Sequence, residues 1–183
     1  MSDFVMPPIA DGATLRPARL GDVPDISRLH ARAFGPGRFA RTAYRVREGA
    51  ALVSPYCRVA ITADGAMAAA LRMTAVEIGG RPGALLLGPL AVAPELANLG
   101  FGRALIAQAL AAARADGLAL VLLVGDVPYY GRFGFTPVPH GHIILPGPVN
   151  PARLLGLALN EGALDQFSGL VTVRRSKQQE PTA

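Results

Sequence analysis

Residues 85–102 read Leu-Leu-Leu-Gly-Pro-Leu-Ala-Val-Ala-Pro-Glu-Leu-Ala-Asn-Leu-Gly-Phe-Gly, and this stretch decides the fold. An apolar strand is interrupted by Gly88-Pro89, and a short loop then leads to Gly100-x-Gly102 and a long helix rich in Ala and Leu. Because proline has no backbone N–H, the interruption predicts a bulge or an edge in the strand. A glycine-rich helix start allows close approach of a ligand and presents unpaired N–H groups at the positive end of the helix dipole. These features predict a site for an extended ligand with a phosphorylated end, bound by backbone groups that the bulge leaves free at Leu90, Ala91 and Val92.

The helix after Gly102 and the strand that follows it predict a parallel crossover. Five apolar side chains share one face of this helix: Leu105, Ile106, Ala109, Leu110 and Ala113. The helix is expected to end at Asp116-Gly117. Leu118–Val124 is fully apolar, the pattern of a strand buried on both faces. A strand, a helix and a strand at this spacing predict a parallel βαβ crossover.

The rest of the chain predicts further strands and helices around this unit. An Asp64-Gly65 dipeptide between two β-like runs is typical of a hairpin. Asp22, as a cap, and Pro24 predict a helix start, and Gly35 its end. The expected strands are Ala13–Arg16, Arg58–Ala63, Met67–Ile78, Ala84–Val92, Phe135–Val138 and Leu170–Val173. The expected helices follow Asp22, span Arg38–Glu48 and Val127–Phe133, and run from Asn150-Pro151 to about Glu161, and a turn is expected at residues 79–83.

Length and composition describe one globular α/β domain. The chain has 183 residues, of which 51% are hydrophobic and 17% charged, so it is neither disordered nor divided by a linker. We expect a single domain over residues 1–175 and a disordered tail at 176–183. A single cysteine, Cys57, fits a reducing compartment. With no secretory signal and no apolar run long enough to span a bilayer, we expect a cytoplasmic protein that does not enter the membrane.

The net charge of +5 is modest and spread along the chain. Seventeen of the 18 basic residues are arginine, with Lys177 the exception. This bias, like the abundance of alanine, points to codon composition. A basic surface attracts polyanions, so an RNA-associated role is one hypothesis, although we expect no nucleic-acid partner.

The glycine motif matches neither common nucleotide-binding loop. A dinucleotide fingerprint requires a third glycine where this chain has Leu105, and no Gly-Lys-Ser/Thr sequence of a Walker A loop occurs. A second motif lies about 28 residues after the first: Tyr130-Gly-Arg-Phe-Gly134-Phe135, preceded by Gly125-Asp126.

The two motifs together resemble the GNAT superfamily of N-acetyltransferases, and look most like its YhbS-like bacterial branch. The resemblance covers residues 13–164. It implies a mixed, mainly antiparallel central sheet flanked by helices, in which a splayed parallel strand pair forms the cleft for CoA. It also implies acetyl transfer from acetyl-CoA, as cosubstrate, to an amine-bearing small molecule or protein, without a metal ion.

The resemblance also assigns roles to individual residues. The backbone of Leu90, Ala91 and Val92 would pair with the pantetheine arm and polarise the acyl carbonyl, as an added strand would. The pyrophosphate would bind the N–H groups of Gly100, Phe101, Gly102, Arg103 and Ala104. Tyr130 would protonate the departing thiolate, because a phenol keeps its proton at neutral pH while a thiolate of pKa about 8.5 accepts it. There are two alternatives. Either Tyr129 is the acid, or the tyrosines only pack the helix against the sheet.

The chain departs from the family pattern in the loop before Gly100, where Asn98 and Leu99 also replace polar or basic residues, and on the central strand. Ala97 replaces the Gln or Arg that usually stands three residues before the first glycine, which predicts weaker CoA binding. Leu86 stands where some members have a glutamate base, which leaves Glu77 and Asp126 as candidates. A non-catalytic acyl-CoA-binding module is therefore the alternative to the enzyme.

Three further features have simple structural interpretations. His140 and His142 lack a third metal ligand, so no metal site is expected. Arg38, Arg41 and Arg45 share one helix face, which is either solvated or favours an acidic acceptor. The apolar residues Leu154, Leu155, Leu157 and Leu159 either cap the groove or form a dimer surface, so the chain is expected to be a monomer or a homodimer.

Overall fold

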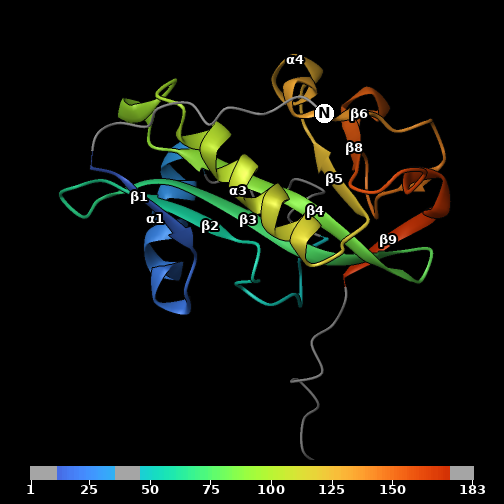
Figure 1. Cartoon of the computed structure of the whole chain (residues 1–183), viewed down its shortest axis with the longest axis horizontal. Coiled ribbons are helices and arrows are strands. Elements are labelled where there is room, and N and C mark those ends of the chain that lie inside the picture. The colour runs from blue at the N-terminus through green and yellow to red at the C-terminus, as the bar shows by residue number, and fades with distance from the viewer. Residues whose placement is uncertain (1–11, 36–45, 174–183) are drawn as a thin grey trace, which may run out of the picture.

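A computed structural model describes residues 12–35 and 46–173 of the chain (Figure 1). A mostly antiparallel sheet crosses the molecule in the strand order β1-β2-β3-β4-β5-β8-β6, with β9 also paired to β3 and β7 paired to β9. Within the described residues, the parallel contacts are β4 with β5 and the short β7 with β9. The strands are β1 (Thr14–Pro17), β2 (Arg58–Ile61), β3 (Met67–Ile78), β4 (Arg81–Val92), β5 (Leu120–Val124), β6 (Thr136–Pro137), β7 (Ile143–Ile144), β8 (Leu154–Ala158) and β9 (Gly169–Val173).

Two longer helices cover opposite faces of the sheet. The helices are α1 (Val23–Phe34), α3 (Phe101–Ala115) and the single turn α4 (Val127–Tyr130). Five short 3₁₀ turns complete the described structure: Leu20–Asp22, Pro94–Leu96, Gly131–Phe133, Pro151–Arg153 and Leu164–Gln166. Because side chains alternate along a strand, Leu71 and Met73 of β3 pack in the α3 cluster while Ala70 packs in the α1 cluster.

The core of the βαβ unit follows the predicted periodicity. All five residues expected on the inner face of α3, from Leu105 to Ala113, are buried against β3, β4 and β5. Gly117 ends the helix with a positive φ of 72°. The strand β5 then runs parallel to β4, which confirms the predicted crossover.

The start of α1 differs from the prediction in one detail. Asp22 occupies the cap position, but its side chain makes no capping hydrogen bond to the helix. Its carboxylate instead accepts hydrogen bonds from both terminal nitrogens of Arg16, at 2.7 and 2.8 Å, and from the Arg19 amide at 2.7 Å. Asp22 therefore ties β1 to the beginning of α1.

The predicted helix after Asn150-Pro151 is wrong. A single 3₁₀ turn over Pro151–Arg153 is followed by β8, which pairs antiparallel with β5 along its whole length. Leu154, Leu155 and Leu157 are buried in the sheet, so they neither cap a groove nor offer a dimer surface. A strand edge of β5 needed a hydrogen-bonding partner, and this tertiary requirement overrides the local preference of a Leu-rich run for helix.

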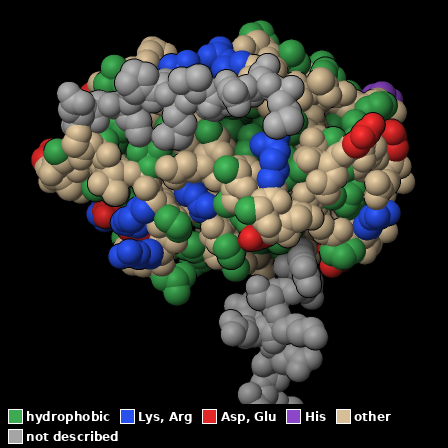
Figure 2. Space-filling view, viewed as in Figure 1, with side chains coloured by type: hydrophobic (Ala, Val, Ile, Leu, Met, Phe, Trp, Pro, Cys, Tyr) green, Lys and Arg blue, Asp and Glu red, His purple; other side chains and the backbone are tan. Residues whose placement is uncertain are grey.

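Smaller differences concern strand boundaries. β4 begins at Arg81, so Arg81-Pro82-Gly83, predicted as part of a turn, belongs to the strand, and β2 ends at Ile61. The predicted helix over Arg38–Glu48 lies largely outside the described residues, as do Arg38, Arg41 and Arg45 and the tail at 176–183. Among the described helices, none is long and apolar enough to cross a membrane. Figure 2 shows the basic side chains of one face in several separate groups among apolar and uncharged residues.

Candidate functional site

The strand β4 separates from β5 halfway along its length. The two strands pair only from Ala84↔Leu120 to Leu86↔Leu122, and beyond this point β5 diverges (Figure 1). At the same place the register between β3 and β4 shifts, because Leu71 pairs with Leu90 but Met73 pairs with Leu87. The extra residue forms the predicted bulge at Gly88-Pro89, where Gly88 has a φ of 109° and the peptide bond is cis.

The bulge exposes one edge of the second half of β4. Leu90, Ala91 and Val92 pair with β3 on one side. On the other side, no described strand pairs with them. Backbone groups on that edge are therefore directed into the gap between β4 and β5, where an extended ligand can bind as an added strand.

The start of α3 lies beside this edge. Asn98 and Gly100 both adopt positive φ, 66° and 87°, and so turn the loop into the helix. The Ala104 amide donates to the Gly100 carbonyl at 3.0 Å, as the first bond of the helix. The amides of Phe101, Gly102 and Arg103 precede that bond and have no acceptor within the helix. A Cβ built on Gly102 would lie only 3.4 Å from Cδ2 of Leu90, which shows how closely the helix start approaches β4.

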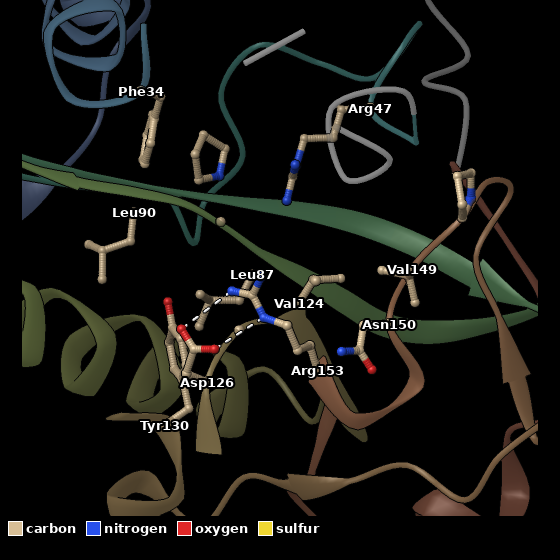
Figure 3. A pocket seen from close by; sticks show the side chains of 14 residues that line it. Phe34, Arg47, Leu87, Leu90, Val124, Asp126, Tyr130, Val149, Asn150 and Arg153 are labelled. Atoms are coloured by element: carbon tan, nitrogen blue, oxygen red, sulfur yellow. Dashed lines mark hydrogen bonds and ion pairs between the residues drawn. The ribbon is translucent and has the colours of Figure 1, made fainter. Parts of the chain in front are cut away.

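The two adjacent tyrosines of α4 point to different places. A Cβ built on Gly102 would lie 2.9 Å from the hydroxyl of Tyr129, so this side chain reaches the start of α3. Tyr130 instead lines the cavity at the bulge, and its ring points toward β4 in Figure 3. Its ring contacts Phe135 edge-on at 6.0 Å between centroids and lies directly against Gly125.

Burial changes the acidity of both phenols. Desolvation raises the pKa of Tyr130 to about 12, with smaller contributions from Tyr129 and Asp126. Desolvation also raises the pKa of Tyr129, while the positive charges of Arg132 and Arg103 oppose that shift. Tyr130 therefore keeps its proton through the whole physiological pH range.

A cavity of about 590 Å³ lies between the β4 bulge and the end of β5 (Figure 3). Its apolar side is formed by Phe34, Leu87, Pro89 and Leu90. Polar side chains from three separate segments also line the cavity: Arg47, Asp126, Asn150 and Arg153. The cavity is thus adjacent both to the open edge of β4 and to the Tyr130 ring.

The two candidate bases have different positions. Asp126 lines the cavity, and its two carboxylate oxygens accept from Nε of Arg153 at 3.1 Å and from Nη2 at 3.3 Å. Glu77 lies near the far end of β3, paired with Thr172 of β9, and is not among the cavity residues. Leu86 is fully buried in the sheet.

The remaining candidates have structural surroundings. A ring nitrogen of His142 lies 3.1 Å from the Leu164 carbonyl. His30 is buried, and its ring lies tilted against Phe34 with 5.8 Å between the ring centroids. Cys57 is buried against the backbone of Met73. No group of three or more potential metal ligands occurs in the part of the chain that the structure describes.

Sequence reasoning missed Arg47, Asn150 and Arg153. Arg47 lies in a turn before β2, and the other two lie about 100 residues later, at the cap and the end of the 3₁₀ turn Pro151–Arg153. Asn150 and Arg153 reach the cavity because β8 returns beside β5, and the Gly125 amide donates to the Arg153 carbonyl at 2.9 Å. No local pattern marks these two residues, since their position depends on a strand that the sequence predicts as a helix, and none marks Arg47 in its turn.

The comparisons with known proteins agree with this geometry. The model of the acetyltransferase (GNAT) domain family matches residues 14–138. The chain therefore belongs to the GNAT acetyltransferase family, as the two sequence motifs predicted. None of the curated proteins matches the chain significantly.

Two solved structures are similar over nearly the whole chain. The GNAT family N-acetyltransferase YhbS from Escherichia coli, in complex with CoA, is 26% identical with a TM-score of 0.76, and the match covers 92% of each chain. A GNAT family acetyltransferase from Brucella melitensis, in complex with acetyl-CoA, is 27% identical with a TM-score of 0.67, covering 88% of this chain and 96% of the other.

Proposed function

We propose that this protein transfers the acetyl group of acetyl-CoA to a primary amine of a small molecule or protein by direct attack. The observation that supports the proposal most strongly is the position of Tyr130. Its ring lines the cavity at the β4 bulge, facing the open strand edge across the gap between β4 and β5. The similarity to two acetyltransferases determined with CoA or acetyl-CoA supports the same cosubstrate.

The residues beside the gap fit acetyl-CoA. The open edge of Leu90, Ala91 and Val92 would bind the pantetheine arm, and the helix start at Gly100–Ala104 would bind the pyrophosphate. The family's usual Gln or Arg is replaced by Ala97, so binding depends on main-chain donors and on Arg103. The acetyl group would then reach the cavity at Gly88-Pro89.

The reaction needs one proton donor, which protonates the departing CoA thiolate. The neutral amine attacks the thioester carbon, a C–N bond forms, the C–S bond breaks, and the proton lost by nitrogen passes to solvent. Tyr130 gives its proton to the departing thiolate and regains one from solvent, so the products are an amide and free CoA. Because burial raises the pKa of Tyr130, the phenol still holds its proton when the thiolate departs.

A second hypothesis is an acyl-CoA-binding module without catalysis. It is favoured by Ala97 and by Asp126, because both carboxylate oxygens of Asp126 already bind Arg153. The two hypotheses share the cosubstrate and differ in turnover.

Thermal unfolding with acetyl-CoA, and with NAD and ATP as controls, tests the cosubstrate. At about 100 times Kd a ligand adds about 2.7 kcal/mol, which raises the Tm of a domain of this size by roughly 5–10 °C. We expect that rise with acetyl-CoA alone. Release of CoA thiol with a panel of primary amines then tests turnover. A rise in Tm without thiol release would favour the binding module, and no rise would contradict both hypotheses.

A further inference from the structure

The hydroxyl group of Tyr129 lies where the two sides of the gap between β4 and β5 approach each other. Tyr129 belongs to α4, which follows β5, whereas Gly102 lies in the first turn of α3, which follows β4 (Figure 1). A Cβ built on Gly102 would lie 2.9 Å from the Tyr129 hydroxyl. The same point is 3.4 Å from Cδ2 of Leu90 and 3.5 Å from Cγ2 of Val92, both in the open half of β4. The hydroxyl therefore lies against bare backbone at the start of α3.

The Tyr129 ring is held in place by three neighbours. Its centroid lies 4.8 Å from that of Tyr130, with the rings edge-on, and 6.1 Å from that of Phe133. The guanidinium carbon of Arg132 lies 5.2 Å from the ring centroid, and Nη2 of Arg132 donates to the Pro128 carbonyl at 3.3 Å. These contacts fix the direction of the ring, and with it the position of the hydroxyl beside α3.

The surroundings of this hydroxyl favour a negatively charged acceptor. Tyr129 is half-buried, and its hydroxyl has no hydrogen-bond partner in the part of the chain that the structure describes. Desolvation raises the pKa of the phenol, and the two charges that oppose this shift are both positive, those of Arg132 and Arg103. Arg103 lies in the first turn of α3, whose amides have no acceptor within the helix. A hydroxyl donor between two cations and beside unpaired N–H groups is suited to an anion.

We infer that the Tyr129 hydroxyl donates a hydrogen bond to the pyrophosphate of acetyl-CoA. This inference rests on the proposed function, in which the start of α3 binds that pyrophosphate. Because the hydroxyl lies beside Gly102, a phosphate group bound to the helix amides would also accept from Tyr129. Tyr129 would thus supply, from α4, a donor that the chain lacks at Ala97. The pyrophosphate would be held from both sides of the gap, while Tyr130 acts at the thioester.

Calorimetric titration with CoA measures the contribution of this hydroxyl. Tyr129→Phe keeps the ring and removes only the donor, and we expect Kd to rise by about tenfold or more, the usual effect of losing one hydrogen bond to a charged group. Tyr56→Phe is the matched control, because the Tyr56 hydroxyl donates to Asp116 at 2.9 Å, at the opposite end of α3. The Kd of that variant should equal the Kd of the unchanged protein.

Phosphorus NMR of bound CoA distinguishes a direct contact from an effect of packing. With each protein saturated by CoA, the pyrophosphate signals should shift between the unchanged protein and Tyr129→Phe, while the signal of the ribose phosphate stays in place. An unchanged Kd in Tyr129→Phe would overturn the inference and leave acetyl transfer intact. A weaker Kd without a shift of the pyrophosphate signals, or with a shift of the ribose phosphate instead, would overturn it as well. Failure of the unchanged protein to bind CoA would contradict the proposed function, and the inference with it.

Discussion

At the scale of single residues, two neighbouring tyrosines have separate surroundings. Tyr129 reaches the start of α3 and lies under the guanidinium of Arg132, 5.2 Å from its ring centre. Tyr130 lines the cavity and is the more strongly perturbed of the two phenols. The sequence motif leaves both as candidate acids, and their side chains point to different places, Tyr130 into the cavity and Tyr129 to the start of α3.

We predict that Tyr130→Phe lowers kcat by about 10²–10⁴-fold, the usual contribution of one positioned acid. The Kd of acetyl-CoA should change by less than about threefold, because the ring stays and only the hydroxyl is removed. Steady-state kinetics and calorimetric titration measure the two effects. Tyr129→Phe is the matched control, and a similar fall of kcat in that variant would contradict the assignment.

The raised pKa of Tyr130 predicts the alkaline part of the pH profile. An acid acts only while protonated, and a pKa raised to about 12 extends the protonated range upward. Ionisation of Tyr130 should therefore cause no loss of rate below about pH 11. Any alkaline decline in that range should occur equally in the unchanged protein and in Tyr130→Phe. A decline centred near pH 9 or 10, lost in that variant, would show that the phenol titrates normally.

Gly125 allows the Tyr130 ring to occupy its position. A Cβ at Gly125 would lie 2.3 Å from Cε2 of Tyr130 and 2.9 Å from Cδ1 of Leu123, both impossible contacts. We predict that Gly125→Ala displaces the ring and lowers kcat at least as much as Tyr130→Phe, with a fall in Tm. Gly131→Ala is the control, because its nearest neighbour would be at 3.7 Å. Unchanged kcat in Gly125→Ala would contradict the role of the ring position.

At the scale of elements, local patterns predicted the parts whose neighbours are close in sequence. The bounds of β3 and the inner face of α3 agree with the prediction, because alternation and 3.6-residue spacing are local properties. The segment after Asn150 was misjudged, since Leu154–Ala158 is a strand only through its pairing with β5. The bulge at Gly88-Pro89 was predictable from proline chemistry, whereas Arg47 at its side was not.

The strand β8 should contribute strongly to stability. Leu155 is fully buried against α3-side residues of the sheet, and truncation leaves a cavity. We predict that Leu155→Ala lowers the free energy of unfolding by about 2–5 kcal/mol. Urea denaturation measures this, with Leu170→Ala as the control because Leu170 is 46% exposed. Similar losses for both variants would contradict the central position of β8.

At the scale of the whole molecule, Asp22 joins β1 to the helix on the face opposite α3. The hydrogen bonds from Arg16 hold the pKa of Asp22 below its ordinary value of 3.8. A carboxyl with a lowered pKa in the folded state stabilises the protein above its unfolded pKa, and this contribution is lost as pH falls through the folded value.

We therefore predict that Asp22→Asn lowers the free energy of unfolding by about 1–3 kcal/mol at pH 7, and by progressively less below about pH 4. Chemical denaturation between pH 7 and pH 3 gives this profile. Asp25→Asn, which removes an exposed ion pair with Arg28, should cost less than about 0.5 kcal/mol throughout. A cost for Asp22→Asn that does not vary with pH would show that the charge is not responsible.

The open edge of β4 also bears on how the protein behaves at high concentration. Residues 87–92 form a strand edge with no partner on β5, and an unpaired edge is the template on which other chains add during edge-to-edge aggregation. The cosubstrate proposed for this edge would fill the same hydrogen-bonding positions. Binding of acetyl-CoA at this edge would then suppress self-association, so that the tendency of the protein to aggregate would fall as the fraction with bound acetyl-CoA rises.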